Sequence, residues 1–152
     1  MNGPVCSSCE IAAGRETTPG GLIYSSELLT LTHHGNPHHA TAGFVILQPR
    51  RHVEHIADLS PDEAEGLGRM LQIVSRALMI LLTPEKVYVC SFGSEVRHVH
   101  FYLIPKSVHM PMGTQLLDEL AEGRWAGTED EATAAANRLR LEVSRLIGES
   151  AH

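Results

Sequence analysis

Residues His98–Pro105 constrain the fold of this chain more than any other segment, because ring-bearing and apolar side chains alternate along them. Alternation with a period of two is typical of a β-strand, whose successive side chains point to opposite faces. We therefore predict a strand that ends near Pro105, since proline donates no hydrogen bond to a ladder. One face would carry His98, His100 and Tyr102, and the face toward the core would carry Val99, Phe101 and Leu103.

Two imidazoles and a phenol in one row suit a chemical site, because imidazole acts as a nucleophile, a base or a metal ligand near neutral pH. The preceding segment Ser91–Glu95 contains a glycine and two hydroxyls. We interpret it as a loop that can approach an anion. The alternative is that both histidines are ordinary residues, either exposed or satisfied by hydrogen bonds.

The 152 residues form one domain that is large enough for a hydrophobic core, without an internal repeat or a Pro/Ser-rich linker. Two capping boxes, Ser60–Glu63 and Thr128–Glu131, each precede a helix with an apolar stripe, and Thr83–Pro84 ends the first helix. Strands are expected at residues 22–24, 28–32, 43–47, 87–89 and 97–104. Because strands and helices are unevenly segregated, we predict an α+β fold with an antiparallel sheet.

The net charge of −6 argues against a nucleic acid polymer or an anionic membrane as the main partner, although Arg50 and Arg51 could hold a phosphate. The first residues lack the pattern of a signal peptide, and the longest apolar stretch, residues 77–82, is too short to cross a bilayer. Three cysteines, two of them in Cys-x-x-Cys, suit a reducing compartment. We therefore expect a cytoplasmic protein.

The alternating segment resembles the motif of the histidine-triad (HIT) family, in which three histidines alternate with apolar residues. Here the segment begins His98-Val99-His100-Phe101-Tyr102, so a tyrosine stands where the third histidine is found in the family. Residues 44–52, an apolar strand followed by Pro-Arg-Arg-His, also resemble the family. The resemblance implies a HIT-like domain over residues 1–152, with a core at about 6–106 and a helical extension at 107–152. It implies a sheet of about five antiparallel strands with one long central helix and a C-terminal helix.

The same resemblance assigns the catalytic roles. His100 would attack the α-phosphorus of a nucleotide to form a nucleotidyl-histidine intermediate, which water or another acceptor then resolves. His98 and Tyr102 would complete the catalytic set, and Gly93 and Ser94 would bind the phosphoryl oxygens. The implied substrate is a small nucleotide, with a purine base expected, such as a phosphoramidate, a dinucleoside polyphosphate or an ester of AMP.

Several residues depart from the family pattern. Tyr102 has an ordinary pKa of about 10 and carries no positive charge at pH 7, so we expect a good leaving group or help from another residue. Phe44 stands where many members have histidine, and no carboxylate lies between Glu27 and Glu54 to grip a ribose; Asn36 is a weaker substitute. Glu95 would repel an anion unless it points away. The alternative function is therefore a HIT-like module that binds a purine nucleotide with little or no turnover.

A second set of residues resembles the zinc site of one subset of the family. The resemblance implies a structural, tetrahedral zinc ion held by two thiolates and two imidazoles. His55 is an alternative to His52, and a redox pair is the alternative for the Cys-x-x-Cys segment. The four implied ligands are Cys6, Cys9, His52 and His98.

The remaining histidines and aromatic residues have ordinary interpretations. A histidine-rich turn is usually solvated, which applies to His33, His34, His38 and His39. Cys90 is interpreted as a core residue, and Trp125 as a packing anchor or a dimer contact. A homodimer is expected from the resemblance alone.

Overall fold

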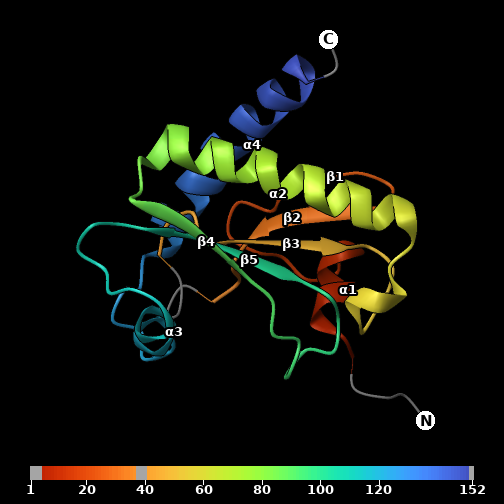
Figure 1. Ribbon diagram of the computed structural model, residues 1–152, viewed down its shortest axis with the longest axis horizontal. Coiled ribbons are helices and arrows are strands. Elements are labelled where there is room, and N and C mark those ends of the chain that lie inside the picture. Colours follow the sequence, from red (N-terminus) through yellow and green to blue (C-terminus); the bar gives the residue numbers. More distant parts are fainter. Residues whose placement is uncertain (1–4, 37–40, 151–152) are drawn as a thin grey trace.

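The structure is a computed structural model, and it describes residues 5–36 and 41–150. Five antiparallel strands form one sheet in the order β1-β2-β3-β5-β4, which confirms the predicted α+β fold (Figure 1). The strands are β1 (Leu22–Ser25), β2 (Leu29–His33), β3 (Val45–Pro49), β4 (Lys86–Cys90) and β5 (Phe101–Lys106). The helices are α1 (Ser7–Ala12), the 3-10 helix η2 (Ile56–Asp58), α2 (Pro61–Leu82), α3 (Thr114–Ala121) and α4 (Glu129–Glu149).

Both capping boxes form as predicted. The Ser60 side chain accepts a hydrogen bond from the Glu63 amide at the start of α2, and Thr128 does the same with Glu131 at the start of α4. Helix α2 ends at Leu82 because Thr83 has a left-handed φ of 45° and Pro84 follows it. Local signals therefore set the ends of the long helices.

The helices cover the sheet on both faces (Figure 1). Helices α2 and α4 pack on one face, and their apolar stripes join Leu31, Leu47 and Leu103 in the main hydrophobic core. Helix α1 lies on the opposite face, and α3 packs near the end of the sheet, where Phe44 and Ile104 belong to a second cluster. Residues 107–152 therefore contribute to both cores.

The predicted strand at residues 97–104 is wrong in its first half. Strand β5 begins only at Phe101, and His98–His100 form an irregular segment in front of it. The Val99 amide donates to the Val53 carbonyl at 2.7 Å rather than to a neighbouring strand. All three side chains of this segment are buried, so the histidines do not share an open face opposite Val99.

Pro105 also does not end the ladder, because it pairs with Val87 and the pairing continues to Lys106. Proline is tolerated there because, among the residues that the structure describes, β5 has no strand partner on its β3 side beyond Leu103. None of the helices within residues 5–36 and 41–150 combines the length and the apolar character needed to cross a bilayer.

Candidate functional site

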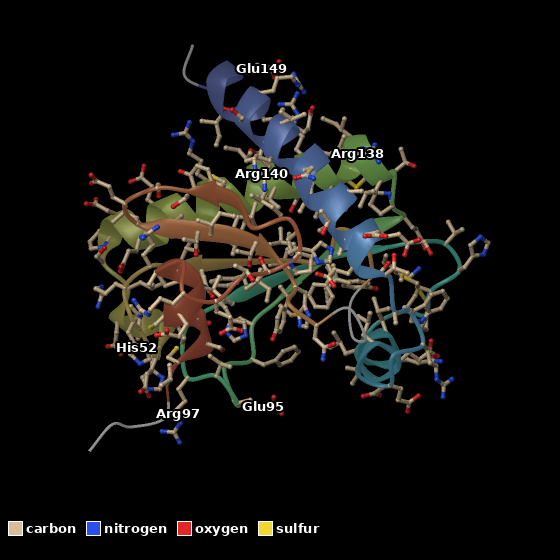
Figure 2. The ribbon with its side chains drawn as sticks, turned by 180° about the vertical axis from the view of Figure 1, so that it is seen from behind. His52, Glu95, Arg97, Arg138, Arg140 and Glu149 are labelled. Carbon is tan, nitrogen blue, oxygen red and sulfur yellow. The ribbon has the colours of Figure 1, made fainter. Side chains whose placement is uncertain are left out.

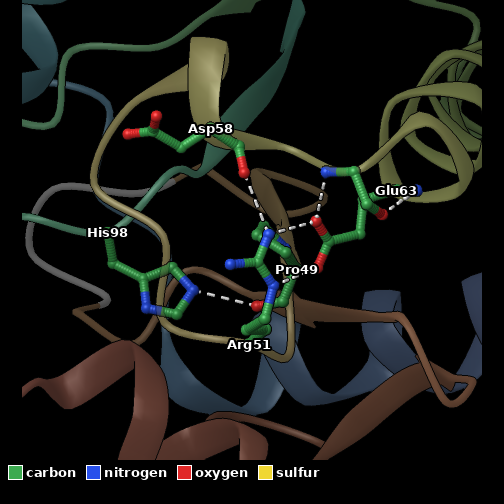
Figure 3. Close-up of polar contacts among 6 residues, drawn as sticks. Pro49, Arg51, Asp58, Glu63 and His98 are labelled. Atoms are coloured by element: carbon green, nitrogen blue, oxygen red, sulfur yellow. Dashed lines mark hydrogen bonds and ion pairs between the residues drawn. The ribbon is translucent and has the colours of Figure 1, made fainter.

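His98 is completely buried at the centre of the site. Its Nε2 lies 2.9 Å from the Pro49 carbonyl oxygen, which only accepts, so Nε2 carries the proton (Figure 3). The other ring nitrogen, Nδ1, lies 3.5 Å from the sulfur of Cys6 and 3.5 Å from that of Cys9. Burial lowers the pKa of His98, so its ring is neutral and offers Nδ1 as a lone-pair donor.

Four side chains form what we call the Cys/His cluster: Cys6, Cys9, His52 and His98. One ligand atom from each lies within 4.8 Å of the other three, and His52 Nδ1 is 3.4 Å from the Cys9 sulfur. Burial and the neighbouring Cys6 raise the pKa of Cys9 to about 11, which a bound cation would reverse. Two sulfurs and two imidazoles at these distances are a donor set that can hold a metal ion.

Separate contacts fix the elements that carry these ligands. Gln48 on β3 donates to the Ser8 carbonyl at 3.0 Å and so ties α1 to the sheet. Arg51, next to His52, makes two hydrogen bonds to the buried Glu63 at 3.0 and 2.7 Å (Figure 3). The ligands from distant parts of the sequence are thus held in place by contacts outside the cluster.

His100 is buried next to this cluster, with 6% of its surface exposed. Its Nδ1 lies 2.7 Å from the carbonyl oxygen of His98, so Nδ1 donates the proton and the neutral ring has an unprotonated Nε2. The backbone of His98 therefore fixes the tautomer that a nucleophile or base requires.

His100 lines a pocket of about 260 Å³, which we call the His100 pocket. Tyr102, Gly93 and Ser94 line the same pocket, so the structure brings four predicted site residues together. Gly93 has a φ of 66°, a conformation that favours glycine in this turn. Glu95 is an exposed residue at the tip of the loop and is among the residues that line the pocket (Figure 2).

Tyr102 lies among aromatic rings beside His100. Its ring centroid is 4.9 Å from that of His100 and 5.3 Å from that of Phe44. Burial raises the pKa of Tyr102, with further contributions from Cys90 and Glu95. The phenol is therefore neutral at pH 7 and can donate one hydrogen bond.

A second pocket of about 520 Å³ adjoins the first, because Phe92, Glu95 and Tyr102 line both. We call it the α3 pocket, since Leu117, Leu120 and Ala121 of that helix form part of its wall. Asn36, the predicted substitute for a ribose ligand, lines this pocket and not the His100 pocket.

Known proteins provide a context for this geometry. Residues 15–109 match the HIT domain family, which is more than half of the chain. This chain belongs to the HIT family. No curated protein sequence matches it significantly.

Solved HIT structures share the fold. A zinc-bound histidine triad family protein from Mycobacterium smegmatis is 19% identical, with a TM-score of 0.72 and 97% of each chain covered. A hypothetical histidine triad nucleotide-binding protein from Sulfolobus tokodaii is 14% identical, with a TM-score of 0.70 and 93% of each chain covered. A Hit-like protein from Bartonella henselae, described as involved in cell-cycle regulation, is 12% identical, with a TM-score of 0.67 and coverage of 88% of this chain and 92% of that chain.

Within this HIT fold, the histidine-rich turn is not simply solvated. His33 is completely buried at the end of β2, where its Nε2 accepts from the Gly43 amide at 3.0 Å and its Nδ1 donates to the His34 carbonyl at 3.1 Å. Burial lowers the pKa of His33, which keeps this ring neutral. His34 packs on Phe44 with ring centroids 4.7 Å apart, and His38 and His39 lie outside the described residues.

Both arginines of the patch that could hold a phosphate, Arg50 and Arg51, make hydrogen bonds within the chain. Arg51 binds Glu63 and the Asp58 carbonyl, and Arg50 donates to the Ser25 hydroxyl at 2.8 Å. His55, the alternative ligand, is not part of the Cys/His cluster and lines a different pocket with Glu54.

The interpretation of Trp125 as a packing anchor agrees with its position against the second cluster, where its indole donates to Glu119 at 2.8 Å. Cys90 is half-buried against the same cluster.

Sequence reasoning missed α1, α3 and the aromatic surroundings of Tyr102. Helix α3 carries Leu116, Leu117 and Leu120 at helical spacing, a signal that could have revealed it. Phe92 and Phe44 gave no such signal, because only the folded chain places them around one ring.

Proposed function

We propose that the protein hydrolyses a nucleotide derivative, or transfers its nucleotidyl group, at the α-phosphate through a nucleotidyl-His100 intermediate. The observation that carries this proposal is the 2.7 Å hydrogen bond from His100 Nδ1 to the His98 carbonyl. It selects the tautomer whose lone pair is on Nε2, in a ring that lines the His100 pocket. A neutral, oriented imidazole is a competent nucleophile at pH 7.

In the first step, His100 Nε2 forms a bond to the α-phosphorus, and the bond from phosphorus to the leaving group breaks. The leaving group takes the electron pair of that bond and a proton from water. In the second step, water or another acceptor adds to phosphorus, loses a proton to solvent and releases His100 as a neutral ring. The Gly93 amide and the Ser94 hydroxyl are the proposed donors to the phosphoryl oxygens.

Tyr102 takes the third position of the triad in this proposal. It stands two residues after His100 and lines the same pocket. As a neutral phenol it would donate a hydrogen bond but supply no positive charge. The substrate should therefore have a leaving group that needs no cationic partner.

We further propose that the Cys/His cluster binds a structural zinc ion. In a tetrahedral site with Zn–S of about 2.3 Å and Zn–N of about 2.0–2.1 Å, sulfur and nitrogen are about 3.5 Å apart. Three of the four sulfur–nitrogen pairs lie 3.4, 3.5 and 3.5 Å apart, which fits that geometry. The bond from His98 Nε2 to Pro49 is the kind of outer contact that orients a metal-bound imidazole. A reducing compartment such as the cytoplasm would keep both thiols available as ligands.

A homodimer through the β4 edge is a separate proposal. Strand β4 is the last strand of the sheet, and 45% of Val89 on it is exposed. An open strand edge with an apolar side chain can pair with a second copy. Light scattering should give a dimer for the wild type and a monomer for Val89→Lys; a monomeric wild type would refute the dimer.

The function is tested by the release of nucleoside monophosphate from adenosine phosphoramidate, diadenosine tetraphosphate, ADP and a UDP-sugar. We expect release by the wild type from at least one compound, and a loss of at least about 1,000-fold in His100→Ala. Equal Tm values and metal contents in the two proteins would show that the fold is intact.

The alternative function is a nucleotide-binding module, favoured by the uncharged Tyr102 and by Phe44, which stands where many family members have histidine. Binding of the same compounds to the wild type without any release would favour the module and reject the enzyme.

A further inference from the structure

The α3 pocket lies beside the proposed reaction centre but is built in part by a segment outside the HIT match. Residues 15–109 match the family, whereas α3 spans Thr114–Ala121. Leu117, Leu120 and Ala121 of α3 line this pocket together with Tyr102 and Phe92. Because Tyr102 and Phe92 also line the His100 pocket, a group attached to a phosphate beside His100 can extend toward α3.

The wall provided by α3 is held in place by its own packing. Leu116 is completely buried and Leu120 is 4% exposed in the second cluster. The Trp125 indole donates to Glu119, which joins the end of α3 to the chain that follows it. The pocket is therefore formed before a ligand arrives, which reduces the entropy cost of binding.

Most of the side chains that line the α3 pocket are aromatic or apolar. The rings of His34, Phe44 and Tyr102 lie in mutual contact, with centroids 4.7 Å apart for His34–Phe44 and 5.3 Å for Phe44–Tyr102. Phe92, Ile104 and Leu117 add further apolar surface. Such surroundings bind a flat uncharged ring by burial and by edge or offset stacking.

The charge of the residues that line both pockets disfavours the binding of a polyphosphate. Among the described residues that line them, Glu95 is the one acidic side chain, and no lysine or arginine is present. Arg97 lines a different pocket with Glu54 and His55, and Arg51 is engaged by Glu63. A chain of further phosphates would thus meet a carboxylate without a cation to balance it.

We infer that the α3 pocket selects substrates in which an uncharged aromatic ring is attached to the phosphate, and that it disfavours a polyphosphate leaving group. This inference rests on the proposed function and names its substrate class. Leu117 determines the specificity because it is a partly buried α3 side chain of the pocket wall. The ring is either a substituent of the leaving group or the nucleobase, and the test separates these two.

The test compares adenosine 5′-phosphoramidate, its N-(2-phenylethyl) derivative and diadenosine tetraphosphate in the wild type and in Leu117→Ala. Leu141→Ala on α4 is the matched control, since Leu141 is 75% exposed and lines neither pocket. We expect the wild type to prefer the phenylethyl compound over the unsubstituted one by about tenfold or more in kcat/KM. Leu117→Ala should reduce that preference about fivefold or more, and Leu141→Ala should leave it unchanged.

A second pair of compounds identifies the ring. Ribose 5′-phosphoramidate lacks the base, so its comparison with adenosine 5′-phosphoramidate reports on nucleobase binding. If Leu117→Ala weakens the preference for adenosine and leaves the phenylethyl preference intact, the nucleobase occupies the α3 pocket. The reverse pattern places the leaving group there. If Leu117→Ala changes neither preference, or if the wild type prefers the tetraphosphate, the inference is overturned.

Calorimetric binding to His100→Ala separates this inference from the proposed function. If the wild type shows no turnover, the proposed enzymatic function is refuted. The inferred ring selectivity of the α3 pocket would still be supported if His100→Ala binds the phenylethyl compound more tightly and His100→Ala/Leu117→Ala loses this difference. Turnover of all three compounds with equal affinity would support the enzyme and reject the pocket.

Discussion

His100 contacts His98 of the Cys/His cluster and Tyr102 of the α3 pocket, and these two regions are built in different ways. In the cluster, His98 is buried and directed by the Pro49 carbonyl, and the loop with His52 is held by the ion pair of Arg51 with Glu63. In the α3 pocket, Phe44 and Phe92 pack around the ring of Tyr102, leucines of α3 complete the wall, and Glu95 is among the lining residues. The first region fixes the geometry of His100, and the second leaves room for a substrate, so changes in the two should have separable effects.

The largest expected effect follows from removing a ligand of the cluster. Cys9→Ser should reduce bound zinc from about one ion per chain to near zero. At free zinc about 1,000 times the Kd, this loss would lower the free energy of unfolding by about 4 kcal/mol. Elemental analysis and denaturant unfolding of untagged protein measure both quantities.

Cys90→Ser is the control for this change, because Cys90 lies on β4 outside the cluster. It should keep the zinc. A wild-type protein without zinc under reducing conditions would contradict the assignment of the cluster.

The next effect concerns the support of the cluster by Glu63. The Arg51 guanidinium holds the pKa of Glu63 below its ordinary value, so the unfolded state binds more protons than the native state as the pH falls. The stability that this pair provides is present at pH 7 and is lost as the pH falls below about 4.5 toward the lower native pKa. Glu63→Gln should cost about 2 kcal/mol at pH 7 in urea unfolding, and less near pH 3.5.

Asp62→Asn changes the neighbouring exposed carboxylate in the same helical turn and serves as the control. It should change the stability by less than about 0.5 kcal/mol. A deficit in Glu63→Gln that is the same at both pH values would show that the ion pair is not its origin.

Tyr102 tests the pocket side of the comparison. Removal of the phenol hydroxyl in Tyr102→Phe should lower kcat by about two- to tenfold without changing the zinc content, since one hydrogen bond contributes about 0.5–1.5 kcal/mol. Tyr102→His should retain or raise the rate. If neither variant differs from the wild type, the position has no part in the reaction.

The smallest expected effect is a gain. Glu95→Gln should raise kcat/KM for anionic substrates by about two- to fivefold at low salt, because a carboxylate at the pocket repels them. The gain should shrink at about 0.5 M salt, since screening weakens the repulsion. An equal gain at both salt concentrations would point to a change in shape instead of charge.

The fold was predictable where local chemistry determines it. The capping boxes at Ser60 and Thr128 place the starts of α2 and α4, because a side chain satisfies free amides there whatever packs around the helix. The alternation at His98–His100 was misleading, since the Val53 carbonyl accepts from the Val99 amide and none of the described strands pairs with this segment. The prediction that His33 is solvated failed for a similar reason. The composition is typical of a solvated turn, but the His33 ring is buried and accepts a hydrogen bond from the Gly43 amide.

The four ligands of the cluster were found through the resemblance to the HIT family, since 89 residues separate Cys9 from His98 and no local pattern joins them. The α3 pocket was not found. Its wall combines Phe44, Phe92 and Leu117, which only the tertiary fold brings together.

The central claim is that His100 becomes covalently linked to the nucleotide. The most direct measurement mixes wild-type protein with adenosine 5′-phosphoramidate, quenches it within milliseconds and locates the adduct by peptide mass spectrometry under alkaline conditions. The account predicts an acid-labile adenylyl group on His100 that forms and decays at the rate of turnover and is absent from His100→Ala. An adduct on another residue such as His34 would contradict it. Turnover by both the wild type and His100→Ala, without an adduct in either, would contradict it too.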